Sequence, residues 1–386
     1  MEEYSPEPFD ADEAGLLTVA GAREQLAESD ALGSATFWTR ADGLAVFYGK
    51  GWAETGLTDP APAWLTLSDG HVYQLTRQAA QQLGSTAKAN KRYQEFIPPD
   101  LLTANVNFAL REGLPETEMK LLLAGEGKDR DGAACPLAVA QCRGSVTPFS
   151  NARLLDVVLL TIRAKLGHAA ADSAAIDYKF FDDREHTSFR VVVPVAQQVI
   201  TGTGDGDSPW CYGVEVSNSA IGAKQTTVSG YLFSLATAAG ITDVERAAGG
   251  FQRRGSTPEA AYAWAAEAAE DVLGGMEDAF NGLQVLTGSE VTGDYQRVLG
   301  QLFRESPVSK DLKLRVLADV EDRDGDLTMY DLADAVALAA NLQDTSWREV
   351  RSLHDLAGHI VHQGGGMCRG QLERGCRRLL PTDWED

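Results

Sequence analysis

The stretch GVEVSNSAIGAKQTTVSGYLF, residues 213–233, contains two segments that suit extended strands on either side of a polar turn. Residues 213–216 alternate between apolar and polar side chains in the manner of a strand, and residues 225–233 suit a second strand. The serines and asparagine at 217–219 are residue types whose side chains hydrogen-bond to the backbone in tight turns, and Gly222 can supply a positive φ. The stretch therefore predicts a strand, a corner and another strand.

Two units upstream of this stretch share a pattern of strand, Asp-Gly and strand. Residues 35–49 alternate around the Asp-Gly pair at 42–43, and residues 64–75 alternate around the pair at 69–70. Asp-Gly is favoured in the tight turns that join the two strands of a hairpin. Both units are therefore predicted to be β-hairpins.

Helical periodicity dominates the chain from about residue 256 onward. Thr257 is a suitable N-cap, and Pro258 suits the first helical position that follows it. Further helices fit the apolar spacing within residues 295–362. We therefore expect an α+β fold in which antiparallel β-hairpins pack with helices, followed by a mainly helical C-terminal part.

Composition divides the chain into three predicted parts. Residues 1–34 form a predicted acidic, loosely ordered arm, because residues 1–30 hold nine acidic side chains and one arginine. Residues 35–240 form the predicted α+β body. Residues 241–386 form the predicted helical part, which can also pack on the body as one domain.

The charge balance limits the partners that the protein can attract. The 386 residues include 56 acidic and 34 basic side chains, which gives a formal net charge of −22. Such a field repels phosphate backbones at long range and argues against nonspecific binding to duplex DNA or to anionic membranes. Salt shortens the field to about 10 Å, so a local basic cluster can still bind an anion.

Cysteine usage and the N-terminal sequence indicate the compartment. The five cysteines are odd in number and lie in distant segments, which is typical of a reducing environment. The chain starts with an acidic segment that lacks the features of a signal peptide, and no apolar run approaches the ~20 residues of a membrane span. We expect a soluble protein of the cytoplasm, without membrane association; an oligomer stays compatible with the sequence.

Motifs for metals and cofactors are incomplete. The acidic run at 322–326 resembles the start of a calcium-binding loop, but positions six and twelve are Leu327 and Ala333 instead of glycine and glutamate. His359, His362 and Cys368 are weak candidates for zinc ligands, and a polar helix face is the default interpretation. No Walker or dinucleotide-binding motif is present. No cofactor and no metal are therefore predicted.

Basic clusters carry more weight in a chain this acidic. Lys88, Lys91 and Arg92 lie next to Tyr93 in the segment KANKRY. Cations interleaved with an aromatic ring suit single-stranded nucleic acid, which offers a charged backbone and flat bases. A solvated helix face is the simpler alternative for any such cluster. Lys224 adds a cation beside the 217–219 turn.

The order of these features resembles one family, the phage/plasmid-like proteins of domain-of-unknown-function family 932. The resemblance covers residues 65–362 and is carried by WLTLSDGHVYQLTRQAAQQLG, IPPDLLTANVNFALREG, PFSNARLLDVVL, YGVEVSNSAIGAKQTTVSGYLF and LTMYDLADAVALAAN. Asn218, Ser219 and Gly222 look like the signature turn of that family. The resemblance implies carriage by a phage, plasmid or other mobile element and hence the cytoplasm of a host cell. It implies no defined activity.

Three functions stay open on the sequence. The leading hypothesis is a non-catalytic role in nucleic-acid metabolism, such as single-strand binding or annealing. In that hypothesis Lys88, Lys91, Arg92 and Lys224 contact phosphates, and Asn218 and Ser219 hydrogen-bond to the nucleic acid. The alternatives are an acidic interaction or inhibitor protein acting on a host factor, and an enzyme with an unrecognised carboxylate or histidine–cysteine site.

Overall fold

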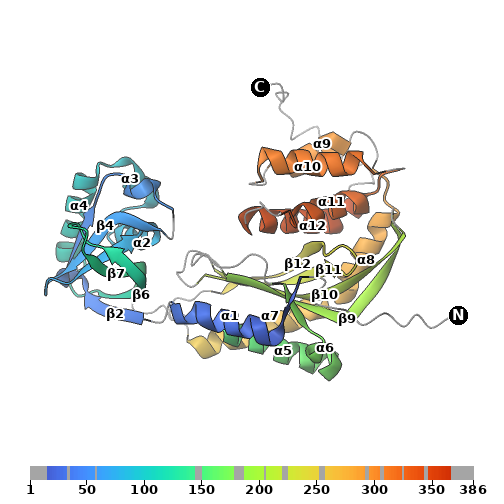
Figure 1. The fold of residues 1–386 in the computed structure, drawn as a ribbon, viewed down its shortest axis with the longest axis horizontal. Coiled ribbons are helices and arrows are strands. Elements are labelled where there is room, and N and C mark those ends of the chain that lie inside the picture. The colour runs from blue at the N-terminus through green and yellow to red at the C-terminus, as the bar shows by residue number, and fades with distance from the viewer. Residues whose placement is uncertain are drawn as a thin grey trace.

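The computed structural model of the chain is an α+β structure with two six-stranded sheets (Figure 1), which confirms the predicted fold class. It describes residues 15–32, 35–56, 59–143, 150–177, 187–203, 206–219, 225–251, 257–291, 295–304, 308–323, 326–342 and 347–366. None of the helices in these ranges is long and apolar enough to cross a membrane.

The first sheet and its helices form the N-terminal domain, residues 35–143. Its strands run in the order β2-β6-β7-β5-β4-β3, and only the β5–β7 pair is parallel. The strands are β2 (Ala35–Arg40), β3 (Leu44–Tyr48), β4 (Pro60–Leu67), β5 (Val72–Thr76), β6 (Glu118–Lys128) and β7 (Ala134–Arg143). The helices are α2 (Arg77–Thr86), α3 (Lys91–Phe96) and α4 (Pro99–Phe108), and a π-helical turn (Ala109–Gly113) continues α4.

Of the two hairpins predicted in this domain, one is confirmed and one is wrong. Strands β4 and β5 pair directly across Asp69-Gly70, and Gly70 has a φ of 89°. Strands β2 and β3 do not pair, because β2 pairs with β6 while β3 pairs with β4. Only the short 3-10 turn Ala41–Gly43 joins these two outer strands of the sheet. The sheet is therefore curled so that its opposite edges approach each other.

Helix α4 covers the outer edge of β3. The side chain of Asn107 accepts a hydrogen bond from the Val46 amide at 2.7 Å and donates to the Val46 carbonyl at 2.8 Å. The Thr103 hydroxyl accepts from the Tyr48 amide at 3.0 Å. Edge strands with unpaired backbone groups promote aggregation, and side chains of a helix here satisfy those groups. These two side chains also fix which face of α4 points away from the sheet.

The second sheet belongs to the C-terminal domain, residues 17–32 and 150–366. It is antiparallel throughout, in the order β1-β8-β9-β10-β11-β12. The strands are β1 (Leu17–Thr18), β8 (Ala175–Asp177), β9 (Thr187–Thr203), β10 (Gly206–Asn218), β11 (Thr226–Ser234) and β12 (Gly240–Phe251). Within the stretch at 213–233, residues 213–218 belong to β10 and residues 226–233 to β11, and these neighbouring strands pair with Val216 opposite Val228. The two predicted strands are present, but Ser217 and Asn218 of the predicted corner belong to β10, and residues 220–224 lie outside the described residues.

Helices cover the second sheet from two sides (Figure 1). Helices α1, α5, α6 and α7 lie on one side, and α11 and α12 lie on the other with α9 and α10 beyond them. The helices are α1 (Val19–Leu32), α5 (Asn151–Leu166), α6 (His168–Asp172), α7 (Pro258–Gly274), α8 (Met276–Thr287), α9 (Tyr295–Leu302), α10 (Lys310–Glu321), α11 (Met329–Ala339) and α12 (Trp347–Gly366). The Thr257 hydroxyl caps α7 by accepting from the Ala260 amide at 3.2 Å, as its sequence predicts.

The sheets divide the chain differently from the predicted parts. Strands β7 and β8 belong to different sheets, so residues 35–240 do not form one body. The predicted boundary at 240–241 is also not found, because β12 starts there, pairs with β11 and shares a core with the helices of the C-terminal domain. Helix α1, from the predicted arm, packs in the same core through Ala22 and Leu26. The rest of the arm, residues 1–14, lies outside the described residues.

Candidate nucleic-acid interface

Lys88 lies at the end of α2 in a backbone conformation that normally favours glycine. Its φ is 68°, its amide donates to the Ser85 carbonyl at 3.1 Å, and the Ala89 amide donates to the Gly84 carbonyl at 2.9 Å. This pair of bonds is a Schellman motif, in which the left-handed position is usually glycine. The motif directs the chain from α2 into α3 and leaves the Lys88 side chain exposed.

Helix α3 is held by its N-cap and by one buried side chain. Asn90 caps the helix by accepting from the Tyr93 amide at 2.8 Å. Gln94 is fully buried, and its amide donates to the carbonyls of Gln81 and Ala89 at 3.1 and 2.7 Å. Because Gln94 fixes the inner face of this short helix, the neighbouring residues 91–93 lie on the exposed side.

Helix α4 presents apolar side chains to solvent as well as to the core. Leu102 and Val106 are buried, whereas Leu101, Asn105 and Phe108 are spaced by four and three residues on the opposite face. The exposed fractions of Leu101 and Phe108 are 48% and 69%. A face this apolar on the outside of a small domain is typical of a binding surface.

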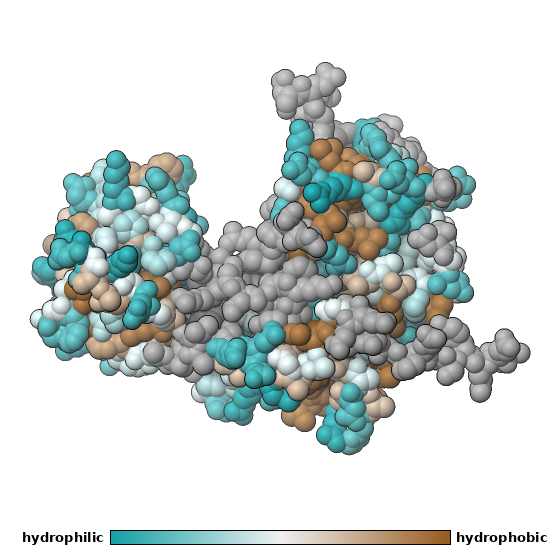
Figure 2. Space-filling view, in the orientation of Figure 1, coloured by the Kyte–Doolittle hydropathy of each residue, from teal (hydrophilic) through white to brown (hydrophobic). Residues whose placement is uncertain are grey.

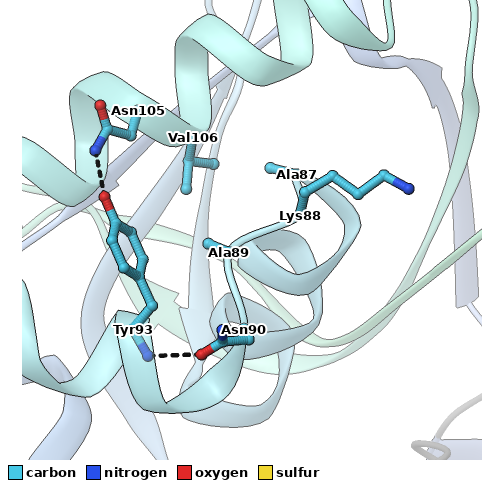
Figure 3. Close-up of a pocket in the computed structure, with 7 residues that line it drawn as sticks. All are labelled: Ala87, Lys88, Ala89, Asn90, Tyr93, Asn105 and Val106. Atoms are coloured by element: carbon cyan, nitrogen blue, oxygen red, sulfur yellow. Dashed lines mark hydrogen bonds between the residues drawn. The ribbon is translucent and has the colours of Figure 1, made fainter.

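The two helices are joined at their exposed faces. The Asn105 side-chain amide donates to the Tyr93 hydroxyl at 2.7 Å (Figure 3). Phe96, one turn beyond Tyr93 in α3, is 79% exposed. We call the following exposed side chains the α3–α4 surface: Lys88, Lys91, Arg92, Tyr93, Phe96, Leu101, Asn105 and Phe108. Hydrophilic and apolar residues are also interspersed across the N-terminal domain in the space-filling view (Figure 2).

A cavity of about 260 Å³ opens on this surface (Figure 3). It is lined by Ala87, Lys88, Ala89, Asn90, Tyr93, Asn105 and Val106. The cavity combines an aromatic ring, two carboxamides and an apolar floor with one cation at its rim.

The local charge differs in sign from that of the whole chain. Residues 77–113 carry five basic and three acidic side chains, whereas the chain carries a net charge of −22. One of the three acids, Glu95, forms an ion pair with Arg77 at 3.3 Å. Lys88, Lys91 and Arg92 are exposed. The structure therefore brings the three predicted cations together with Tyr93 on one surface.

Asn218 and Ser219 do not lie on a surface, which corrects their predicted contact with nucleic acid. Their exposed fractions are 1% and 0%. The Asn218 amide donates to the Asn151 side-chain oxygen at 2.6 Å, and the Thr226 hydroxyl donates to the Asn218 oxygen at 2.9 Å. Asn218 is thus a structural residue that ties the end of β10 to the start of α5. Gly222 and Lys224, the other residues predicted at this turn, lie outside the described residues.

Asp30 completes the connection at the start of α5. Its carboxylate accepts from the Ser150 hydroxyl at 2.6 Å, from the Asn151 amide groups at 2.9 Å and from the Ala152 amide at 3.1 Å. A carboxylate at a helix N-terminus also interacts favourably with the helix dipole. Residues from α1, α5 and β10 therefore share one polar network.

We expect Asn218→Ala to lower the free energy of unfolding by about 1–3 kcal/mol, because it removes the partner of the buried Asn151 oxygen. Urea denaturation followed by circular dichroism measures the change. Asn105→Ala, at an exposed position, is the matched control and is expected to change stability by no more than about 0.5 kcal/mol. Equal stability of the two variants would contradict the structural role of Asn218.

A second polar cluster lies in the C-terminal domain, around the buried Arg190 of β9. Its guanidinium is 3.2 Å from the Asp177 carboxylate and 3.6 Å from the Glu215 carboxylate. Burial disfavours the charge, but Tyr231 and the two carboxylates outweigh it and raise the pKa of Arg190. Burial likewise opposes ionisation of Glu215, but Arg190 and Arg351 lower its pKa. Each ion therefore stabilises the charge of the other.

Helix α12 adds Arg351 and Asp355 to this cluster. Arg351 donates to the Ser217 hydroxyl at 2.6 Å and lies 3.7 Å from the Asp355 carboxylate. Burial raises the pKa of Asp355 to about 6, with the Glu215 charge acting in the same direction and Arg351 against it. The Thr242 hydroxyl donates to Glu215 at 2.9 Å. These groups hold α12 on the sheet through paired charges.

The histidines of α12 lie in three different environments. His354 is buried with its ring 5.8 Å from that of Tyr231, and His359 is exposed. His362 lies 2.8 Å from the Asp243 carboxylate, which also accepts from the Tyr212 hydroxyl at 2.8 Å. Within the described residues, no group of three His, Cys, Asp or Glu side chains could hold a metal ion. Cys368, the third weak candidate, lies outside those residues.

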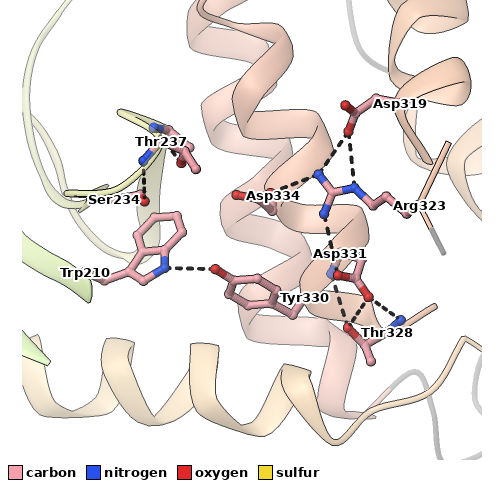
Figure 4. Close-up of polar contacts among 10 residues, drawn as sticks. Trp210, Ser234, Thr237, Asp319, Arg323, Thr328, Tyr330, Asp331 and Asp334 are labelled. Atoms are coloured by element: carbon pink, nitrogen blue, oxygen red, sulfur yellow. Dashed lines mark hydrogen bonds and ion pairs between the residues drawn. The ribbon is translucent and has the colours of Figure 1, made fainter. Parts of the chain in front are cut away.

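Arg323, in the acidic run at 322–326, forms ion pairs with carboxylates outside that run (Figure 4). Arg323 lies 2.9 Å from the carboxylates of both Asp319 and Asp334. The Thr328 hydroxyl accepts from the Asp331 amide and its own amide donates to the Asp331 carboxylate, so the two form a capping box at the start of α11. These contacts serve to join α10 to α11.

Sequence reasoning missed the apolar half of the α3–α4 surface. Phe96, Leu101 and Phe108 were not singled out, because a short helix with apolar residues on both sides does not show which side faces the core. The spacing of Leu101 and Phe108 by seven residues was the available signal.

Comparisons of the chain with protein-family models, with curated proteins and with solved structures found no match.

Proposed function

We propose that the protein binds single-stranded nucleic acid through the α3–α4 surface, in a non-catalytic role such as strand protection or annealing. The observation that supports this proposal is the presence of exposed aromatic rings next to exposed cations on one helical pair. The rings of Phe96 and Phe108 and the cations Lys91 and Arg92 are the elements that contact a single strand.

Two interactions would contribute to this binding: cations attract the phosphates, and aromatic rings stack on the bases. Lysine and arginine neutralise backbone phosphates and release bound counterions, which makes such binding salt-dependent. Aromatic side chains stack on unpaired bases, and each stacked base contributes about 1–3 kcal/mol. Duplex DNA hides its bases, and the acidic remainder of the chain repels its dense charge. The surface is therefore expected to favour single strands over duplexes.

The proposed biological setting is the cytoplasm of a cell that hosts a phage, plasmid or other mobile element. It rests on the resemblance of residues 65–362 to phage/plasmid-like proteins. Mobile elements commonly encode proteins that manage DNA, and single-stranded DNA is the partner that this setting and the α3–α4 surface have in common.

The test is binding of a fluorescein-labelled dT oligonucleotide, measured by fluorescence anisotropy from 20 to 200 mM salt. We expect Lys88→Ala/Lys91→Ala/Arg92→Ala to weaken binding at low salt. The slope of log affinity against log salt should fall by about 2, since each phosphate contact with a single strand contributes about 0.7. The matched control is Lys310→Ala/Arg315→Ala, which removes two exposed cations of α10 and should leave binding unchanged.

Two results would overturn the proposal. One is the absence of binding by the unmodified protein at tens of micromolar in low salt. The other is an equal loss of affinity in the α10 control, which would mean that binding follows net charge and not the α3–α4 surface.

A further inference from the structure

We propose that the 260 Å³ cavity between α2, α3 and α4 is a pocket for one unstacked base of the bound strand, with Lys88 at the adjacent phosphate. This inference rests on the proposed single-strand binding and assigns a ligand class to one place on the α3–α4 surface.

The walls of the cavity suit a flat, partly polar ring. Tyr93 offers the face of its ring on one side, and Ala87, Ala89 and Val106 form an apolar opposite side and floor (Figure 3). A volume of about 260 Å³ is just below the range of ordinary small-ligand pockets, which starts near ~300 Å³. A space of this size suits a single ring system.

Two carboxamides can bind the polar edge of a base. The Asn105 amide nitrogen donates to the Tyr93 hydroxyl at 2.7 Å, and its Oδ1 points away from Tyr93 (Figure 3). The Asn90 oxygen accepts from the Tyr93 amide at 2.8 Å, so the nitrogen of that carboxamide faces elsewhere. The two carboxamides line the cavity, one in α4 and one at the N-cap of α3, and a carboxamide carries both a donor and an acceptor, as base edges do.

Lys88 gives the cavity a cation at the required place. Its side chain extends from the rim away from Tyr93 (Figure 3). A base in the cavity therefore has its sugar and phosphate at the rim, near this ammonium group. The backbone of Lys88 has a φ of 68°, which a side-chain-bearing residue adopts at a cost, whereas glycine adopts it freely.

The discriminating probe is a 12-mer of abasic sites, which keeps every phosphate of dT12 and removes every base. The unmodified protein is expected to bind dT12 at least about 5-fold more tightly than the abasic 12-mer, because the abasic strand loses the base in the cavity together with any base stacked on Phe96 or Phe108. Both oligonucleotides should show the same salt slope, because their charge is the same.

Single substitutions measure the contributions of the Tyr93 ring and the Lys88 cation to binding separately. Tyr93→Ala is expected to weaken dT12 binding by about 5- to 150-fold, the range that corresponds to stacking of one base, and to leave the abasic 12-mer unaffected. Tyr93→Phe keeps the ring and should retain most of the affinity. Lys88→Gly relieves the positive φ, so its melting temperature should not fall, while its salt slope for both oligonucleotides drops by about 0.7. Leu160→Ala, an exposed position of α5, is the control for loss of apolar surface.

The outcomes distinguish this inference from the function on which it rests. No loss of dT12 affinity in Tyr93→Ala would overturn the base pocket and leave single-strand binding through Phe96, Phe108 and the cations standing. Equal affinity of the unmodified protein for dT12 and the abasic 12-mer would overturn base stacking altogether and leave only a phosphate contact. If the protein binds neither oligonucleotide, both the base pocket and the proposed single-strand binding are overturned. An equal loss with Tyr93→Ala and Tyr93→Phe would also overturn the pocket, since stacking requires only the ring.

Discussion

Arg190→Met is expected to lower the free energy of unfolding at pH 7.5 by about 3–5 kcal/mol, which is the cost of breaking a buried ion pair from one side. The exposed fractions of Arg190, Asp177 and Glu215 are 2%, 3% and 1%. Methionine is similar in length and keeps the packing, so the loss comes from two carboxylates that stay buried without the guanidinium. Urea denaturation at pH 7.5, followed by far-ultraviolet circular dichroism, measures it.

The deficit of this variant should shrink when the pH is lowered to 5. In the unmodified protein the pKa of Glu215 is held below its usual value, so its ionisation stabilises the fold above that usual value. In the Arg190→Met variant, burial has the larger effect on Glu215, because the main opposing charge is gone. The pKa of Glu215 then rises above its value in the unfolded chain. The destabilisation from ionised Glu215 then develops as the pH rises above the pKa that Glu215 has in the unfolded chain. It is lost again when the pH falls below that value. Repeating the denaturation at pH 5 tests this sign.

Arg23→Met is the control for loss of an ion pair in general. Arg23 lies 2.6 Å from Asp156, but the two side chains are 49% and 44% exposed. Exposed pairs contribute no more than about 1 kcal/mol, so this variant should remain near the stability of the unmodified protein. A deficit for Arg190→Met as small as that of Arg23→Met would contradict the assignment of the cluster as a buried ion network.

Gly358→Ala is expected to destabilise the protein by about 3 kcal/mol. Gly358 lies in α12 where that helix crosses β12, and a Cβ there would overlap the carbonyl oxygen of Thr242. The same Cβ would lie 3.2 Å from a methyl carbon of Val244. The obstacle is backbone, which cannot rotate away, so the helix must move off the sheet. Thermal and urea denaturation measure the loss.

Gly274→Ala is the matched control because Gly274 is also in a helix. It is the last residue of α7, and no atom lies within 4 Å of a Cβ built there. Alanine is the better helix former, so this variant should gain stability by up to about 1 kcal/mol. Opposite signs for the two glycine variants are the expected result. A stable Gly358→Ala protein would mean that α12 does not approach β12 this closely.

The fold class could be predicted from the sequence because hairpins and helices can be recognised from patterns of residues that are close together in the chain. The Asp-Gly pair at 69–70 and the cap at Thr257 are recognised within a few residues, and both are present. The Asp-Gly pair at 42–43 led to a wrong hairpin prediction, because β2 pairs with β6, which is about 80 residues away in the chain, and not with β3. The domain boundaries failed for the same reason. Local composition does not show which sheet a helix packs against.

The candidate site shows the same limit at the level of single residues. The cations at 88–92 were predicted because a basic cluster is conspicuous in an acidic chain. Asn218 was misplaced because asparagine in a turn suits either solvent or a buried partner. Its partner Asn151 lies 67 positions away in the chain. Phe96 and Phe108 were missed because their exposure depends on how α3 and α4 pack on the rest of the domain.

The hydrogen bonds of Asp30 have a consequence for how the N-terminal domain is attached. Asp30 lies in the last turn of α1, just before the chain enters residues 35–143, and Ser150 and Ala152 are among the first residues after it returns. The points of departure and return are therefore held within hydrogen-bond distance of each other. A domain joined through neighbouring ends can be gained or lost as a unit, because the fold that it interrupts needs only a short connection to close. The α3–α4 surface is thus carried on a module that the rest of the architecture accommodates like a long loop.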